Sequence, residues 1–364
     1  MIPLSIPEIR GNEWKYIKEC LDTNWVSSAG SYVDLFEQRF CEYVGSAKAV
    51  VTVNGTSALH LALECLGIKA GDEVIVPSMT FISPVNAVRY VGAEPVFADV
   101  CRDTYVMDAQ KVEELISNRT KAIMPVHIYG HPVDMDMIMD IAHRHNLYVI
   151  EDATESLGSR YKGRHTGTIG HIGCFSFNGN KLITTGAGGM LVTNDDKLGN
   201  RAKYISNQTK TVLGNGGFYH EEIGFNYRMP NLLAAMGVAQ LENIDEYVNI
   251  KKANAVYYSG ILGDITGITL PVCREWADNV YWLYSIIVED EFPYSRDKLI
   301  EKLKSNGIES RPFFVPVHSM PPYMSCRRGS LDMTDEISKK GINLPSSISL
   351  SKDQIDIICH TISG

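Results

Sequence analysis

Short apolar segments that alternate with helical segments constrain the fold of this 364-residue chain more than any other feature. The segments at residues 49–53, 73–77, 94–99 and 122–126 are rich in apolar residues and are separated by longer stretches, several of which favour helix. Apolar strands joined by helices are typical of parallel sheets that are covered on both faces. We therefore expect an α/β fold with a mostly parallel central sheet.

A second, smaller unit is expected towards the end of the chain. The polar segment at residues 241–252 has the pattern of a connecting helix. Strands are predicted beyond it at residues 281–288 and 309–315, and helices at residues 295–306 and 352–361. We expect a large α/β domain with an irregular N-terminal arm over residues 1–245 and a small α+β domain over residues 246–364.

Polar residues follow three of the predicted strands. The Asn-Gly-Thr-Ser motif at residues 54–57 follows the first strand, residues 78–81 follow the second, and Asp152 follows a strand predicted at residues 147–150. In open α/β sheets, ligands bind beyond the carboxyl ends of the strands. The sequence therefore predicts a ligand site where these segments meet.

The motif at residues 54–57 has the features of a phosphate site. Gly55, Thr56 and Ser57 open a predicted helix, where backbone N–H groups and the helix dipole favour an anion and the hydroxyls add donors. The alternative is an ordinary helix cap, which serine and threonine often supply. Ser176 offers a further hydroxyl, and we favour the phosphate interpretation.

Lys181 lies five residues after Ser176 and before a glycine-rich turn at residues 186–189. Its neighbours in sequence are apolar, which disfavours the ammonium form and frees the amine to attack a carbonyl. Asp152 could cap a helix, or it could keep a pyridine nitrogen protonated. A lysine that forms a Schiff base, a carboxylate and a phosphate loop are the groups that a pyridoxal phosphate (PLP) enzyme needs.

Four further residues are candidates with an open alternative. Glu155 lies one helical turn beyond Asp152 and faces either the cofactor ring or solvent. Phe81 stacks on a flat ring or fills the core. Asn226 is a helix cap or a ligand residue, and His318 is a substrate contact or a loop histidine.

These segments together resemble the DegT/DnrJ/EryC1/StrS family of sugar aminotransferases. The resemblance runs from residue 6 to residue 345, and its most specific parts are the five segments at residues 54–59, 77–81, 151–153, 176–181 and 224–229. It implies a fold-type I, aspartate aminotransferase-like enzyme that uses PLP, and pyridoxamine phosphate in the half-reaction, on nucleotide-linked keto-sugars.

The resemblance also implies a role for individual residues. Lys181 would carry the cofactor and move the proton, Asp152 would pair with the pyridine nitrogen, and Phe81 would cover one ring face. The phosphate would be held by Gly55, Thr56, Ser57 and Ser176, with Asn226 reaching it from the partner subunit of a homodimer that shares its active sites. Glu155 would lie near the ring oxygen, and the substrate would contact Asn180, Arg311 and His318.

The expected reaction is transamination of a keto-sugar with L-glutamate, which leaves as 2-oxoglutarate. Many members have glutamate where this chain has Ala187, and glutamine or histidine near Glu155. The pattern most resembles the branch that makes 4-amino-4,6-dideoxy sugars from UDP-4-keto-6-deoxy-N-acetylglucosamine, for polysaccharide or glycoprotein biosynthesis. The alternative is GDP-perosamine synthase, which acts on GDP-4-keto-6-deoxymannose.

Two other functions are alternatives to transamination. A PLP-dependent sugar dehydratase is disfavoured because some relatives of that kind replace the lysine with histidine. A non-catalytic regulator is disfavoured because Lys181 and Asp152 are both present.

The charge, the cysteine spacing and the apolar runs of the chain limit its partners and its cellular location. The net charge of −9, without a run rich in lysine or arginine, argues against nucleic acid as a partner. The eight cysteines have no C-x-x-C spacing, so we expect reduced thiols and no metal site. No apolar run is long enough to cross a membrane and no secretory signal is evident, so we expect a soluble cytoplasmic protein.

Overall fold

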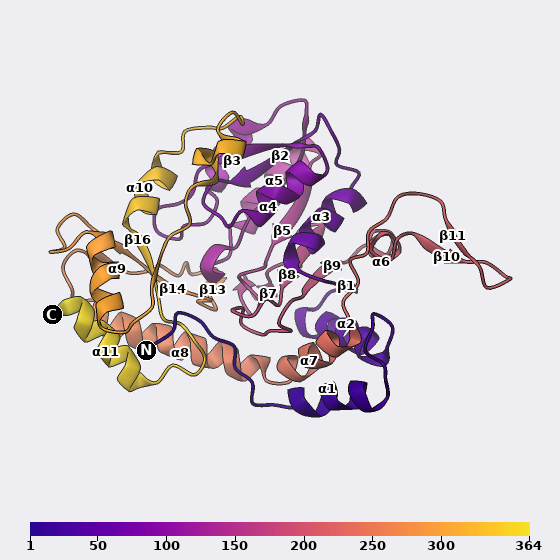
Figure 1. Cartoon of the computed structure of the whole chain (residues 1–364). Coiled ribbons are helices and arrows are strands. Elements are labelled where there is room, and N and C mark those ends of the chain that lie inside the picture. Colours follow the sequence, from indigo (N-terminus) through magenta and orange to yellow (C-terminus); the bar gives the residue numbers. More distant parts are fainter.

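A central sheet of seven strands forms the larger part of the protein (Figure 1), whose computed structural model describes residues 1–364. The strand order is β1-β9-β8-β5-β4-β2-β3, and only β9 runs opposite to its neighbours. The expected α/β fold with a mostly parallel sheet is therefore confirmed. The strands are β1 (Lys48–Thr52), β2 (Glu73–Pro77), β3 (Glu94–Ala98), β4 (Thr120–Ile123), β5 (Tyr148–Asp152), β8 (Ile172–Ser176) and β9 (Gly189–Thr193).

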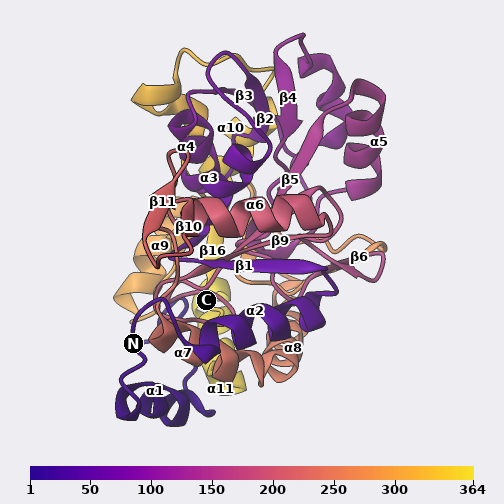
Figure 2. The ribbon, with the colours of Figure 1, turned by 90° about the vertical axis from the view of Figure 1, so that its right-hand side faces the viewer.

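Helices cover both faces of this sheet because successive strand residues point to opposite sides. On β1, for example, Val50 belongs to one apolar cluster, and Ala49 and Val51 belong to the other. Figure 2 shows α6 and α2 on opposite sides of β1. One face packs against α3 (Gly55–Cys65), α4 (Ser83–Tyr90) and α6 (Asp196–Ser206), and the other against α2 (Ser31–Val44), α5 (Met135–His145) and α7 (Asn231–Leu241).

The C-terminal part contains an antiparallel sheet in the order β12-β14-β16-β15. A third apolar cluster lies here and takes its members from residues 255–362, together with Ile2. The predicted division near residue 245 falls at the start of α8. The elements are α8 (Ile244–Leu262), β12 (Ile268–Thr269), β14 (Tyr284–Val288), α9 (Arg296–Ser305), β15 (Arg311–Pro312), α10 (Asp332–Lys340), β16 (Gly341–Leu344) and α11 (Lys352–Ser363).

The strand predicted over residues 309–315 is much shorter in the structure, where β15 contains only Arg311 and Pro312. Proline lacks the N–H group that a strand donates to its neighbour. Pro312 therefore donates no hydrogen bond to β16, and residues 313–315 lie outside the strand and line the cavity described below.

Two segments extend from the body. The helix α1 (Glu13–Asp22) packs on α7, and the hairpin of β10 (Lys210–Val212) and β11 (Phe218–His220) projects away from the sheet (Figure 1). The sequence analysis did not predict this hairpin. A small sheet of β13 (Ala277–Asp278), β6 (Arg160–Tyr161) and β7 (Arg164–His165) completes the fold.

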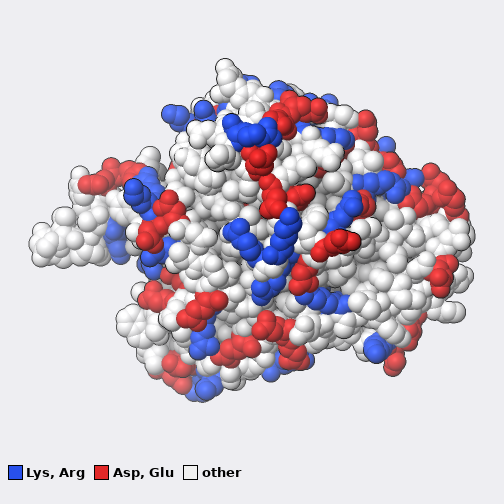
Figure 3. Space-filling view, turned by 180° about the vertical axis from the view of Figure 1, so that it is seen from behind, with Lys and Arg blue, Asp and Glu red and all other residues white.

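The surface carries both charge signs. On the face shown in Figure 3, lysine and arginine side chains lie interspersed with aspartate and glutamate. None of the helices combines the length and the apolar character that crossing a bilayer requires.

Candidate active site

A cavity of about 640 Å³ opens where the carboxyl ends of β1, β2, β5 and β8 meet. These strands run in the same direction, so the residues that follow them reach the same edge of the sheet. The sequence-predicted residues in its wall are Gly55, Thr56, Phe81, Asp152, Glu155, Ser176, Asn180, Lys181 and Arg311.

The start of α3 forms one end of the cavity. Asn54 caps the helix by accepting a hydrogen bond from the Ser57 N–H at 2.8 Å. A Cβ atom on Gly55 would lie 2.9 Å from the Ser176 Cβ, so only glycine lets the first turn of α3 approach the end of β8 this closely. Thr56 donates a hydrogen bond to Ser83 Oγ at 2.9 Å, which brings a further hydroxyl to this end.

Ser57 is a predicted phosphate residue that lies outside the cavity wall, and its role stays a prediction. Its N–H is already bonded to Asn54, and the residue is buried and does not belong to the cavity wall. Hydroxyl residues in the wall at this end include Thr56, Ser83 and Ser176. Together with the positive end of the α3 dipole, they suit a phosphate group.

Asp152 ends β5 and is almost fully buried. The Thr154 N–H donates a hydrogen bond to Asp152 Oδ1 at 3.0 Å. Burial raises the pKa of the Asp152 carboxyl, and hydrogen bonds from Thr154 and the charge of Lys181 act in the opposite direction. A buried carboxylate of this kind is stabilised by a cationic partner, such as a protonated ring nitrogen.

Lys181 lies in the turn that follows β8, and its side chain is only 13% exposed. The ammonium nitrogen lies 3.8 Å from Glu155 Oε1 and 3.9 Å from the centroid of the Trp282 ring. Burial lowers the pKa of Lys181, and the charges of Glu155 and Asp152 act against this shift. The amine is therefore poised to be neutral more easily than that of an ordinary lysine.

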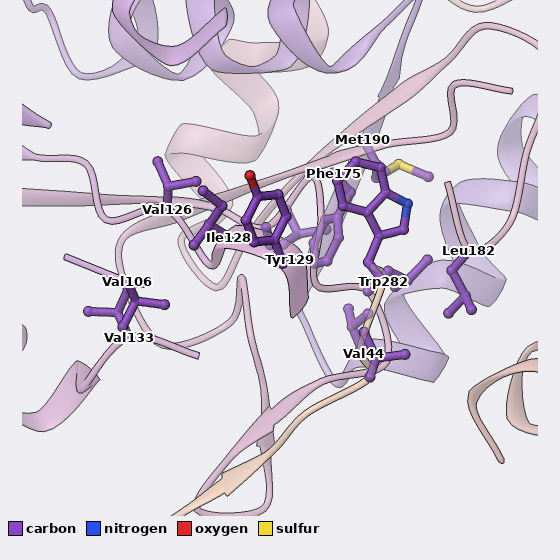
Figure 4. Packing of buried hydrophobic residues seen from close by; sticks show 14 of the residues in the cluster. Val44, Val106, Val126, Ile128, Tyr129, Val133, Phe175, Leu182, Met190 and Trp282 are labelled. Carbon is purple, nitrogen blue, oxygen red and sulfur yellow. The ribbon is translucent and has the colours of Figure 1, made fainter. Parts of the chain in front are cut away.

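Trp282 is a member of this site that the sequence analysis missed. It belongs to the same apolar cluster as Phe175 and Leu182 (Figure 4). Its indole N–H donates a hydrogen bond to the carbonyl of Asn180 at 2.8 Å. No local pattern around residue 282 signals this contact, because its partners lie about a hundred residues earlier in the chain.

Glu155 faces the cavity, so the solvent-facing alternative is wrong. Its side chain is 4% exposed, and Oε2 accepts a hydrogen bond from the Tyr129 N–H at 2.9 Å. Tyr129 adopts a left-handed backbone conformation with φ of 54°, which is strained for a residue with a side chain. Burial raises the pKa of the Glu155 carboxyl, and the charge of Lys181 opposes this shift.

The mouth of the cavity combines aromatic rings and a cation. Phe81 is 54% exposed, and its ring centroid lies 5.8 Å from that of Phe314, so it does not fill the core. The side chain of Arg311 is 61% exposed, and one of its nitrogens lies 3.2 Å from Glu309. Arg311 therefore has donors available for a ligand.

Two predicted residues lie outside the wall of this cavity. His318 forms a hydrogen bond of 2.7 Å with Ser78 Oγ and lies 3.4 Å from Asp335, so its ring joins a C-terminal loop to the end of β2. Its predicted contact with substrate is therefore not supported. Asn226 pairs with Asn207 in an isolated bridge, and its role in a partner subunit stays a prediction.

The sequence profile of the DegT/DnrJ/EryC1/StrS aminotransferase family matches residues 7–363. The chain belongs to this family. Among its relatives, the GDP-perosamine synthase of Escherichia coli O157:H7 is 44% identical, and the match covers 100% of this chain and 98% of the relative. That of Caulobacter vibrioides is also 44% identical, over 98% of this chain and 95% of the relative.

Several solved structures have the same fold. S. venezuelae DesV superposes with a TM-score of 0.90 at 34% identity, and the match covers 97% of this chain and 93% of that one. Spr1654 of Streptococcus pneumoniae, described as a putative sugar aminotransferase, was solved in PMP and PLP forms. Its PMP form superposes with a TM-score of 0.94 at 25% identity, and the match covers 100% of this chain and 98% of that one. The expected family, aminotransferase class and PLP cofactor are confirmed.

The polar groups in the cavity wall are of the types that PLP, the cofactor of this family, requires. Hydroxyls and a helix N-terminus lie at one end, a buried carboxylate faces the interior, and a desolvated lysine lies in the wall. Glycine at position 55 lets the start of α3 lie against the rest of the wall, because a Cβ there would lie 2.9 Å from Ser176 Cβ and 3.1 Å from Thr154 Cγ2.

Other wall residues that the sequence analysis missed come from distant parts of the chain. They are Leu4 in the N-terminal arm and Phe313, Phe314 and Asn343 in the C-terminal part. Apolar and amide residues of this kind occur throughout every protein, so their sequence neighbourhoods carry no signal of a site.

Proposed function

We propose that this aminotransferase converts the 4-keto group of a GDP-linked 4-keto-6-deoxyhexose into an amine, with L-glutamate as the amino donor. The observation that carries the proposal is the match to GDP-perosamine synthases at 42–44% identity over almost the whole chain. The sequence analysis placed a UDP-linked substrate first, and these matches favour its GDP-linked alternative.

Bound PLP would supply an electron sink and a temporary carrier for the amino group. We propose that Thr56 and Ser176 hold its phosphate, that Asp152 pairs with its ring nitrogen, and that Lys181 holds it covalently. The burial of Asp152 supports its role, because a carboxylate without a nearby salt-bridge partner gains most from a cationic ring.

Lys181 would move the proton at the reacting carbon of the substrate. Its Nζ lies in the cavity wall, and its lowered pKa makes the neutral amine more available near neutral pH. Glu155 lies 3.8 Å away and can stabilise the ammonium form after the amine has taken up a proton. A positioned acid–base group of this kind accelerates a reaction by roughly 10²–10⁴-fold.

The mouth of the cavity suits a nucleotide diphosphate. The exposed guanidinium of Arg311 would pair with phosphate oxygens, for which its planar donors are well arranged. The rings of Phe81 and Phe314 offer flat apolar faces near it. Asn180 also belongs to the wall and would contact the sugar.

We further propose a homodimer with shared active sites. Large apolar side chains are exposed on α1 and near the β10–β11 hairpin, among them Trp14 at 81%, Phe218 at 64% and Ile223 at 88%. Exposed apolar groups of this size mark interaction surfaces. Asn226 follows the hairpin and lies outside the cavity of its own chain, which is compatible with a contact to the partner's cavity.

The nucleotide is tested with glutamate whose amino nitrogen carries a heavy isotope. The protein is incubated with this donor and, separately, with GDP-4-keto-6-deoxymannose and UDP-4-keto-6-deoxy-N-acetylglucosamine. We expect mass spectrometry to find the isotope in the GDP-linked product at a much higher rate. Preference for the UDP-linked sugar would contradict the proposal, and loss of oxygen without gain of nitrogen would indicate a dehydratase.

A further inference from the structure

Lys251 is a buried lysine that the proposed reaction does not use. It lies in α8 and is 4% exposed. Its ammonium group donates hydrogen bonds to two backbone carbonyls, that of Trp282 at 2.6 Å and that of Ser346. Burial lowers its pKa to about 7, and no carboxylate pairs with it. An apolar side chain of similar length would avoid this cost of burying a charge.

Both acceptors of Lys251 belong to segments that form the active-site wall. Trp282 lies in the wall itself, with its ring against the Lys181 ammonium and its indole N–H bonded to the Asn180 carbonyl. The Ser346 N–H donates to the carbonyl of Leu4, which also lies in the wall. Through its two hydrogen bonds, Lys251 therefore links the Trp282 segment and the Ser346 segment on the side of the wall that faces away from the cavity.

We propose that Lys251 is a positioning residue, which fixes the backbone of Trp282 so that the indole ring stays over Lys181 and bonded to Asn180. The Trp282 residue is then held at both ends, by its carbonyl on the α8 side and by its indole N–H on the cavity side. Loss of the Lys251 donor leaves a buried carbonyl unpaired, which is costly enough to displace the segment. The indole would move with it and would expose Lys181.

The test measures how fast an amine-directed acetylating reagent modifies Lys181 in the full-length apoprotein, by peptide mass spectrometry. The rate is divided by that of Lys298, which is exposed and has no salt bridge, so that differences in reagent concentration and pH between samples cancel. We expect K251M to raise this ratio several-fold, and W282A to raise it as well. The adjacent K252M is the matched control, because Lys252 pairs with Asp278 at 2.6 Å instead, and its ratio should not change.

A double variant separates positioning from a general structural role. If Lys251 acts through Trp282, K251M should add little in the W282A background, because coupled residues are not additive. An unchanged ratio in K251M, or full additivity with W282A, would overturn the proposal. Should K251M fail to fold, K251Q replaces it: glutamine is too short to reach both carbonyls, so an unchanged ratio there also contradicts the proposal.

The importance of the Lys251–Trp282 contact for catalysis rests on the proposed role of Lys181. The acetylation test of that contact does not depend on this role. Borohydride reduction of the cofactor-loaded protein, followed by peptide mapping, identifies the lysine that holds PLP. A different lysine in that experiment would refute the proposed role of Lys181, while the labelling ratios would still decide whether Lys251 positions Trp282.

Discussion

At the scale of single residues, the environment of Lys181 determines its chemistry. Its nitrogen lies between the Glu155 carboxyl and the face of the Trp282 ring, and it is almost removed from water. Desolvation favours the neutral amine, whereas the carboxylate and the ring favour the ammonium. A lysine in this balance changes its charge with little free energy, which suits a group that takes up and returns a proton.

Replacement of Lys181 by alanine should abolish turnover, with a loss of at least about 10²-fold because a positioned acid–base group is removed. The fold should survive, since a buried ammonium contributes little to stability. Turnover with glutamate and the keto-sugar is measured beside circular dichroism and the binding of pyridoxamine phosphate. Near-normal turnover in K181A would refute the assignment.

Replacement of Glu155 by glutamine should lower the pKa of Lys181 further. The Glu155 charge raises that pKa in the wild type, and glutamine keeps the shape but removes the charge. In the apoprotein, the pH at which Lys181 becomes reactive towards an acetylating reagent should therefore move to lower pH. A titration that stays in place, or moves to higher pH, would show that the carboxylate does not act on the lysine.

Lys251 should make stability depend on pH. Its pKa is about 7 in the folded protein and near 10.5 in the unfolded chain, so between these values the unfolded chain binds more protons. Its contribution to the free energy of unfolding therefore rises as pH increases through this window, by about 1.4 kcal/mol for each unit. Urea unfolding of the apoprotein at pH 7 and pH 9 should show a smaller increase in K251M than in the wild type.

At the scale of elements, the start of α3 depends on a close approach to β8. Gly55 is the first residue of the helix, and Asn54 caps it. The sequence predicted this strand, turn and helix because all three are encoded by neighbouring residues. The same signal did not indicate that Ser57 is buried outside the cavity wall, because this position follows from the orientation of the helix within the fold.

Replacement of Gly55 by alanine should destabilise the protein by about 1–3 kcal/mol, because the added methyl group overpacks the site against Ser176. It should also weaken cofactor binding, since the phosphate end is displaced. Gly260→Ala is the control: it lies within α8 with free space around it, so it should be neutral or slightly stabilising. Urea unfolding and cofactor retention during dialysis are measured, and equal behaviour of the two variants would contradict the prediction.

At the scale of the whole molecule, the active site joins three distant parts of the chain. The large sheet supplies Asp152 and Ser176, the C-terminal part supplies Trp282 and Arg311, and the N-terminal arm supplies Leu4. The arm and the projecting hairpin also leave large apolar side chains exposed. These features favour an assembly in which a second copy covers them.

The proposed sharing of active sites in a homodimer predicts complementation between two inactive variants. K181A lacks the lysine, and N226A lacks the residue that the partner would supply. If each site takes Lys181 from one subunit and Asn226 from the other, a mixture refolded together should contain hybrid dimers with one intact site, and it should be more active than either variant alone. Activity no higher than that of the separate variants would argue against sharing. Light scattering of the wild type would establish the oligomeric state.

The sequence by itself determined β1 to β5 and the turns at the carboxyl ends of several of them, and it singled out Gly55, Asp152, Ser176 and Lys181. Each of these signals is local: an apolar run, a glycine beside hydroxyl residues, or a charged residue after a strand. The same patterns predicted the α/β class, since continuous apolar strands are stable only between two layers of helices.

Only the tertiary structure decided which groups touch Lys181. Trp282, the Tyr129 N–H that orients Glu155, and Lys251 behind the wall all act across long sequence separations. Tyr129 contributes its backbone N–H, and the Lys251 ammonium binds backbone carbonyls. Backbone atoms are the same in every residue type and leave no trace in a sequence. The fold also places His318 outside the cavity wall, where its ring bonds to the side chain of Ser78, a partner 240 residues away.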